Sequence, residues 1–80
     1  MSIDTAIRDM QARIELVSPG AQVKIVKLSD EEARLSVFVP AAQVQPIRAA
    51  TLQPSLDLLN QDGLDLQVLV YDKDHPPQVG

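Results

Sequence analysis

The sequence has no cysteine and no tryptophan, and its 80 residues include only one phenylalanine, one tyrosine and one histidine. Without cysteine the chain can form neither a disulfide bond nor a thiolate metal site, which fits a reducing compartment. Without more aromatic side chains, a core must be packed from leucine, isoleucine, valine and alanine. These absences predict a small aliphatic core and few side chains suited to chemistry.

The chain also lacks an excess of positive charge and a long apolar run. Eleven acidic residues against seven basic ones give a net charge of −4, the wrong sign for binding that depends on phosphate contacts. The apolar runs fall far short of the roughly 20 residues that cross a bilayer, and the N-terminus lacks a basic segment followed by an apolar one. We therefore expect a cytoplasmic protein whose partners are neither nucleic acid nor a membrane.

The first apolar repeat, over residues 2–17, predicts an amphipathic helix. Ser2 can cap its first turn, and the run Ser18, Pro19 and Gly20 ends it. The charged side chains of the opposite face are expected to lie in water. The apolar positions alternate in spacing between four and three residues, as the buried face of a helix requires: Ile3, Ile7, Met10, Ile14 and Val17.

Two β-branched segments follow, residues 22–28 and 33–39, and the polar stretch between them predicts an antiparallel hairpin. In the first segment Val23 and Ile25 alternate with polar residues until Val26 breaks the rhythm. Either a bulge resets the strand at Val26, or both faces of the strand are partly covered. In the second segment one face carries Ala33, Leu35, Val37 and Val39, and the other carries Arg34, Ser36 and Phe38.

Residues 40–60 have a helical composition that is interrupted by Pro46 and Pro54. A proline inside a helix costs about 3 kcal/mol, whereas a proline in the first turn costs little. We therefore expect two helices, residues 41–52 and 54–60, with a single kinked helix as the alternative. The side chains expected to pack on the sheet are Val44, Ile47, Leu52, Leu56 and Leu59.

Residues 64–72 show the clearest strand alternation and complete the element order α-β-β-α-β. This order predicts an α+β fold, a two-layer sandwich in which the helices cover one face of a three-stranded, mostly antiparallel sheet. We expect one domain over residues 1–72 and a flexible C-terminal tail over residues 73–80, which has no apolar repeat. The covered face is expected to carry Val23, Leu35, Val37, Leu66, Val68 and Val70.

The opposite face of the sheet is expected to carry several large apolar side chains and an arginine. A contiguous exposed apolar patch often marks an interface, although single exposed apolar residues are ordinary. A short sheet with open edges can also extend by pairing with a copy of itself, which makes a homodimer a reasonable hypothesis. The expected interface residues are Val26, Phe38, Leu69, Tyr71 and Arg34.

No pattern in the sequence indicates catalysis, a metal ion or a cofactor. His75 lies beside two prolines, where we expect nothing to orient its ring for base catalysis. Asp72, Asp74 and His75 could ligate a divalent ion, and the acidic turn of residues 30–32 could attract one, but neither has an ordered second shell or EF-hand spacing. The glycines are too far apart to form a phosphate loop. We expect a protein that is not an enzyme and binds no metal or cofactor.

The element order resembles that of two families of small α+β domains. With Pro19 and Gly20 leading into the first strand, it is similar to the C-terminal domain of NifU-type iron–sulfur scaffold proteins, whose Cys-x-x-Cys pair has no counterpart in residues 40–46. With the middle helix broken in two, it is similar to KH-like RNA-binding domains of the bacterial topology, and residues 49–54 stand where that family has a Gly-x-x-Gly loop. Both resemblances rest on topology, so they imply a fold and not a function.

We therefore interpret the chain as a small non-enzymatic module for protein interaction or self-association, which uses the open sheet face and a free edge. One alternative is a KH-like RNA-binding domain without the glycine loop, which requires a single basic stripe built from Lys24, Lys27, Arg34 and Arg48. The other is an accessory subunit of an enzyme, which would have a pocket lined by convergent polar groups.

Overall fold

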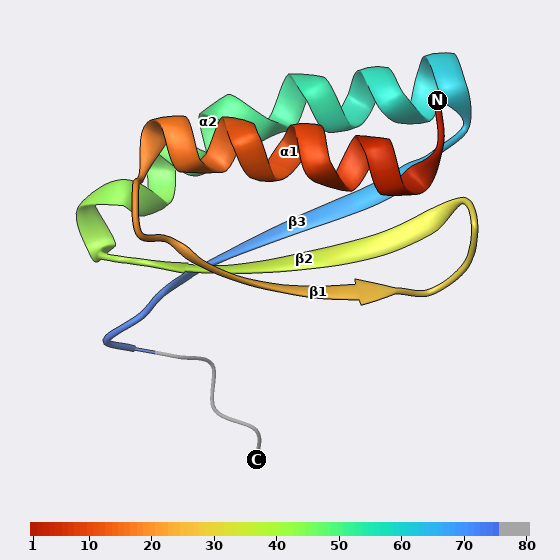
Figure 1. Ribbon diagram of the computed structural model, residues 1–80. Helices are drawn as coiled ribbons and strands as arrows, with labels where there is room; N and C mark the ends of the chain where they lie inside the picture. The colour runs from red at the N-terminus through yellow and green to blue at the C-terminus, as the bar shows by residue number, and fades with distance from the viewer. Residues whose placement is uncertain (76–80) are drawn as a thin grey trace.

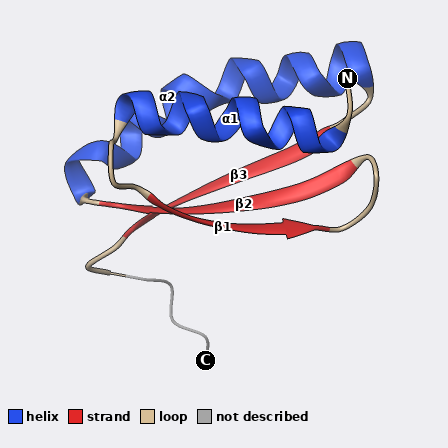
Figure 2. Cartoon of the chain, viewed as in Figure 1, coloured by secondary structure: helices blue, strands red, loops and turns tan. Residues whose placement is uncertain are grey.

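The protein is a two-layer α+β sandwich in a computed structural model that describes residues 1–75. Two helices lie side by side over one face of a three-stranded sheet, and the other face of the sheet is open (Figures 1 and 2). In chain order the elements are α1 (Ile3–Val17), β1 (Gln22–Lys27), β2 (Glu32–Val39), α2 (Ala41–Asp57), the π-helical turn η1 (Leu58–Asp62) and β3 (Asp65–Asp72). The predicted fold class and element order are confirmed.

Helix α1 forms where the apolar repeat predicts it. Ser2 is the N-cap: its hydroxyl accepts a hydrogen bond from the backbone N–H of Thr5 at 3.2 Å, which satisfies one of the unpaired groups of the first turn. Asp4 lies near the positive end of the helix dipole. The face that packs on the sheet consists of the predicted stripe widened by one alanine: Ile3, Ala6, Ile7, Met10 and Ile14 are buried, and Val17 is half-buried.

Strand β2 is the centre of a mixed sheet with the order β1-β2-β3. It pairs antiparallel with β1, with Val23 opposite Val37, and parallel with β3, with Leu35 opposite Val68. A parallel neighbour requires a crossover connection, which α2 and η1 supply. The strand that the hairpin and the crossover share is therefore central and fully covered on its helix side, where Ala33, Leu35, Val37 and Val39 are all 0% exposed.

The break in the pattern at Val26 does not come from a bulge. The pairing of β1 with β2 is regular from Gln22 opposite Phe38 to Lys27 opposite Ala33, so successive side chains alternate without interruption and Val26 points to the open face. Ile25 points to the helix side but is 41% exposed, because the helical layer does not fully cover this edge strand. Val26 and Ile25 are thus both partly exposed, on opposite faces.

Helix α2 runs without interruption through Pro46 and Pro54, so the prediction of two separate helices is wrong and the single-helix alternative holds. The helix then widens into the π-helical turn η1. Gly63 ends η1 in the left-handed conformation, with φ +66°, and its N–H bonds to the carbonyl of Leu59 at 3.2 Å. The tertiary contacts of α2 with the sheet outweigh the local cost of the prolines.

The face of α2 that packs on the sheet differs from the prediction. Ile47 is 0% exposed and Thr51 is 3% exposed, and the hydroxyl of Thr51 donates to the carbonyl of Ile47 at 2.9 Å. Ser55, half-buried one turn later, donates to the carbonyl of Thr51 at 2.9 Å. These hydroxyls can face the sheet because their hydrogen bonds are satisfied within the helix. The leucines expected in the core point outward instead: Leu52 is 62%, Leu56 42% and Leu59 48% exposed.

The hydrophobic core lies between the two layers and is aliphatic, as the composition predicts. Its buried members come from α1, β2, α2 and β3, together with Leu64 before β3, and Val44 and Leu58 pack against it from α2 and η1. Within residues 1–75, every buried side-chain nitrogen or oxygen has a hydrogen-bond partner. The core therefore contains no unpaired polar group that would call for a ligand.

Candidate functional site

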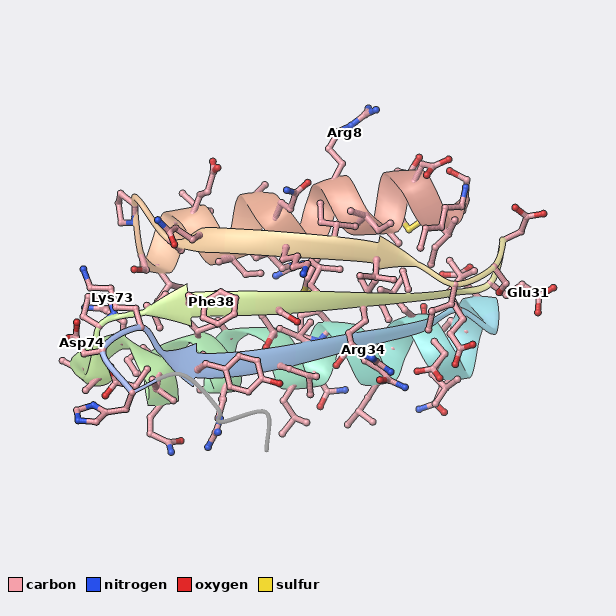
Figure 3. The ribbon with its side chains drawn as sticks, turned by 90° about the horizontal axis from the view of Figure 1, so that it is seen from below. Arg8, Glu31, Arg34, Phe38, Lys73 and Asp74 are labelled. Atoms are coloured by element: carbon pink, nitrogen blue, oxygen red, sulfur yellow. The ribbon has the colours of Figure 1, made fainter. Side chains whose placement is uncertain are left out.

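The open face of the sheet brings together some of the predicted interface residues and separates others. Phe38 and Tyr71 are paired across β2 and β3, and their rings stack with centroids 5.4 Å apart. Leu69 lies two residues before Tyr71 on the same face and is 37% exposed. Val26 lies on β1 opposite Arg34 of β2, whereas Leu69 lies on β3. The polar side chains of β2 therefore stand between Val26 and Leu69. The contiguous apolar part of this face is thus Phe38, Tyr71 and Leu69, and Figure 3 shows where Phe38 lies on it.

Arg34 lies at the margin of this apolar patch, between Val26 of β1 and Gln67 of β3. Its Nε atom donates to the side-chain carbonyl of Gln67 at 3.5 Å, at the end of the face farther from Phe38 (Figure 3). The open face is therefore mixed in character, apolar near the C-terminal ends of β2 and β3 and polar toward their N-terminal ends.

The four basic residues that an RNA-binding alternative requires lie on three different surfaces. Lys24 and Arg34 point to the open face of the sheet, because each is paired with a residue of that face. Lys27 alternates to the helix side, where its Nζ atom lies 3.4 Å from Asp4 of α1. Arg48 is exposed on α2. The single basic stripe is not formed, and the RNA-binding alternative loses this support.

Three small hollows lie on the surface of the part of the chain that the structure describes. A hollow of about 190 Å³ between α1 and η1 is lined by polar side chains that include Asp9, Arg13 and Asp62. It is the feature nearest to the polar pocket expected of an enzyme's accessory subunit. A second hollow, of about 330 Å³, lies at the end of the sheet beside Phe38 and Lys73.

The third hollow lies between α2 and β3. It measures about 310 Å³ and is lined by Arg48, Thr51, Leu52, Ser55 and Val68. It combines an exposed leucine of α2 with Val68, a valine that points to the core side of β3 and is only half-buried. Viewed from below, α2 lies behind β3 along this side of the molecule (Figure 3).

The edge of β3 next to this hollow has no strand partner within residues 1–75. Asp65 N–H bonds to the carbonyl of Glu31 at 2.8 Å, and Lys73 N–H bonds to the carbonyl of Val39 at 2.9 Å, so odd-numbered residues of this segment face β2. In a regular parallel pair the alternate residues point their N–H and C=O groups the other way. Leu66, Val68 and Val70 therefore present backbone donors and acceptors at the free edge.

We call this surface the β3 flank and define it as the free edge of β3 from Leu66 to Val70 together with Arg48, Leu52 and Ser55 of α2. No charged side chain occurs in the sequence between Leu66 and Tyr71. The β1 edge differs, because Lys24 lies on its open side and Lys27 lies on its helix side, tied to Asp4. An inward-pointing charge on an edge strand disfavours pairing with another strand. On the helix side of β3 the only charged residue is Asp72, at the strand's last position, so the segment from Leu66 to Val70 carries no such charge.

Lys73 to His75, expected to belong to a flexible tail, form a turn that is hydrogen-bonded to Asp72. The N–H of Asp74 donates to Asp72 Oδ1 at 2.9 Å, and His75 Nδ1 lies 3.1 Å from Asp72 Oδ2. The bond from the Asp74 N–H, aided by the hydrogen bond and charge of His75, lowers the pKa of Asp72. The His75 side chain is nonetheless 85% exposed. The remaining residues of the expected tail, 76–80, lie outside the described residues.

The acidic turn of residues 30–32 is open to solvent. The Asp30 side chain is fully exposed and its Oδ1 lies 4.0 Å from Lys27 Nζ, while Glu31 extends away from the sheet at the end of the hairpin (Figure 3). Among residues 1–75, no three histidine, cysteine, aspartate or glutamate side chains are grouped so that they could hold a metal ion. None of the helices in that range is long and apolar enough to span a bilayer.

Leu69 and Tyr71 lie on the open face, where they were expected, whereas Leu52, Leu56 and Val68 were expected in the core and are exposed or half-buried. A signal was present: α2 contains a second repeat, Ile47, Thr51 and Ser55, at the same helical spacing as the leucines and about one residue out of phase. Comparison of the chain with protein-family models, curated proteins and solved structures finds no match. Any functional interpretation must therefore come from the chain's own surfaces.

Proposed function

We propose that this chain is a small, non-enzymatic module that binds a protein partner or itself through the β3 flank and the adjoining part of the open face. The observation that carries the proposal is the coincidence of two exposed features on one side of the molecule. One is an uncharged strand edge with free backbone groups, and the other is the leucine-bearing side of α2 directly beside it.

Each feature alone is common in proteins, but together they match the requirements for strand addition. A strand that pairs with β3 gains main-chain hydrogen bonds from Leu66, Val68 and Val70. Its side chains on the helix side meet Leu52 and Val68, and those on the other side meet Leu69. Backbone bonds then supply affinity, and the apolar contacts on both sides supply additional burial.

The orientation of α2 supports the same proposal. The helix places Thr51 and Ser55 toward the sheet and Leu52 and Leu56 toward solvent. The exposed side chains of these leucines leave apolar surface uncovered, and burying such surface is worth about 25 cal/mol per Å². A partner that covers the leucines would recover this stabilisation.

The proposal is tested by comparing two leucine variants with the same chemical change. Leu52→Glu puts a charge in the β3 flank, whereas Leu16→Glu puts one on the exposed face of α1, where Leu16 is 84% exposed. We expect Leu52→Glu to weaken self-association, or binding of peptides selected from a random library on the wild-type chain, at least about tenfold, since a charge must then be desolvated. Leu16→Glu should bind as the wild type does.

Two-dimensional NMR of the wild-type chain provides the readout. Dilution, or addition of the selected peptides, should shift the amide signals of Leu66, Val68 and Val70. The proposal is overturned if the chain stays monomeric at millimolar concentration and no selected peptide shifts these signals, or if both leucine variants weaken binding equally.

A further inference from the structure

The sequence of β3 and the residue after it is nearly symmetric in chemical character about Leu69. Val68 and Val70 flank the centre, Gln67 and Tyr71 come next, and the outermost pair is Asp65 and Lys73. The pair between these last two, Leu66 and Asp72, is the one exception, apolar on one side and acidic on the other. An acidic residue four positions before the centre is thus matched by a basic residue four positions after it. A strand with this property is complementary to its own copy when the two run antiparallel.

From this symmetry we propose that the β3 flank binds a second copy of the same chain, with the two β3 strands paired antiparallel about a two-fold axis at Leu69. The proposal rests on the function proposed above and specifies its partner. The product is a homodimer with one continuous six-stranded sheet, in which the order β1-β2-β3 of one chain continues into β3-β2-β1 of the other.

The backbone of β3 permits this register. In an antiparallel pair centred on Leu69, Val68 lies opposite Val70 of the copy, and both belong to the set whose N–H and C=O groups point to the free edge. Each such pair exchanges both of its backbone hydrogen bonds. Leu69 lies opposite its own copy as a non-hydrogen-bonded pair, the arrangement that brings side chains closest. If the register shifted by one residue, each residue whose backbone groups point to the free edge would lie opposite a residue whose groups point to β2, and these hydrogen bonds would be lost.

The side chains agree with the same register on the open face and at the centre of the helix side, and the one mismatched pair is Leu66 opposite Asp72 of the copy, near the ends of the paired segment. On the open face, Gln67 lies opposite Tyr71 of the copy, whose hydroxyl is a partner for the amide. Lys73 is the first residue after β3, and its N–H still bonds to the carbonyl of Val39, so in this register it comes opposite Asp65 of the copy. All three charged residues, Asp65, Asp72 and Lys73, lie near the ends of the paired segment, which leaves Leu69 at an uncharged centre. On the helix side, the half-buried Val68 gains Val70 of the copy as a neighbour, and the Leu52 sides of the two α2 helices come to face each other.

Charge favours the β3 edge over the β1 edge. Each chain carries a net charge of −4, so two copies repel each other and need local attraction where they meet. Pairing through β3 provides opposite charges, Asp65 with Lys73, twice by symmetry. Pairing through β1 brings Lys24 and Lys27 of both copies together, and Lys27 is already held by Asp4.

Charge-reversal variants test the register directly. D65K places lysine opposite lysine, and K73D places aspartate opposite aspartate. Either variant should raise the dimer dissociation constant on the order of thirtyfold, because two symmetric cross-strand pairs turn from attractive to repulsive. Mixing the two variants in equal amounts should restore association as a heterodimer, and so should combining both changes in one chain. Matched controls are K24D on β1 and E15K on α1, which change the net charge equally and should dimerise as the wild type does.

Sedimentation equilibrium at low salt measures the mass against the 8.7 kDa of one chain, and circular dichroism verifies that each variant is folded. Isotope-filtered NMR on a mixture of labelled and unlabelled wild-type chains should detect contacts between Val68 and Val70 of different copies. The proposal is overturned by a wild type that stays at 8.7 kDa up to millimolar concentration, or by a dimer that D65K and K73D leave intact. It is also overturned if the mixed variants fail to recover association.

These outcomes separate the two proposals. If the wild-type chain is monomeric while selected peptides still shift the signals of Leu66, Val68 and Val70, the second copy is the wrong partner and the interaction function stands. If neither dimer nor peptide binding occurs, both proposals fail together.

Discussion

The orientation of α2 can be tested by truncating two neighbouring faces of the helix, with Ile47→Ala and Leu52→Ala. Ile47 is 0% exposed in the core, so its truncation should lower the free energy of unfolding by about 2–5 kcal/mol through lost burial and the cavity left behind. Leu52 is 62% exposed, and alanine and leucine both favour helix, so its truncation should cost less than about 0.5 kcal/mol. The apolar pattern of the sequence predicts that both side chains are buried and that both changes are costly.

The total stability of the domain makes this difference easy to measure. A chain of 80 residues is expected to have a free energy of unfolding of about 4–12 kcal/mol, so the loss at Ile47 is a large fraction of the total. Urea unfolding followed by circular dichroism should show a clear fall in the midpoint for Ile47→Ala with an unchanged slope. The midpoint for Leu52→Ala should stay close to that of the wild type. The measurements are made at low micromolar concentration, so that association does not add to the apparent stability.

Equal losses for the two variants would refute this account of α2. They would mean that Leu52 is buried in solution, and the β3 flank as defined here would then lose its main apolar residue. A large loss at Leu52 alone would mean that the helix is rotated by about one residue, with Thr51 facing solvent.

Three further predictions concern local features of the fold. Ser2→Ala removes the oxygen that accepts the N–H of Thr5 and should lower stability by about 1 kcal/mol in urea unfolding, whereas Ser2→Asp should not. Gly63→Ala places a side chain at φ +66°, where nothing lies within 4 Å, so the strain of the left-handed conformation alone should cost about 1–2 kcal/mol of unfolding free energy; a neutral result would contradict it. The pKa of Asp72 is lowered in the folded chain by the N–H of Asp74 and by His75, so its contribution to stability is present above the ordinary carboxyl pKa and is lost as pH falls through the folded value. Asp72→Asn should remove that part of the acid dependence of the urea midpoint, and an NMR titration of Asp72 with an ordinary carboxyl pKa would refute the assignment.

The sequence predicts the elements whose signals are local. Helix α1 agrees with its prediction because an N-cap, a continuous apolar stripe and a stop signal all lie within the helix itself. Strand β3 agrees because strict alternation over its length leaves one assignment of faces. The parallel pairing of β3 with β2 has no local signal, since it depends on where the crossover through α2 returns the chain.

Helix α2 was predicted less well because two apolar repeats compete along it. A count of apolar residues favours the leucines, since it treats Thr51 as polar and therefore exposed. In the folded chain Thr51 is buried without the free-energy cost of an unpaired hydroxyl, because that hydroxyl donates to the carbonyl of Ile47 within the helix. The candidate site was only partly predicted for the same reason. The prediction assigned the leucines of α2 to the core, so the open face of the sheet was the only apolar surface left to propose as an interface.

Once α2 is placed correctly, the exposed apolar residues are distributed unevenly around the molecule. The β1 edge carries Lys24 and Lys27, and the second of these is anchored on the helix side by Asp4. The β3 edge has no charge across its centre and has leucines beside it. Either edge of this small sheet can pair with another strand. Lys24 lies near the centre of β1 and disfavours such pairing, whereas the charged residues of β3, Asp65 and Asp72, lie at its two ends. An edge that lacks this protection and also adjoins exposed leucines is better explained by a strand that occupies it than by chance, because an unoccupied edge of this kind exposes the chain to aggregation.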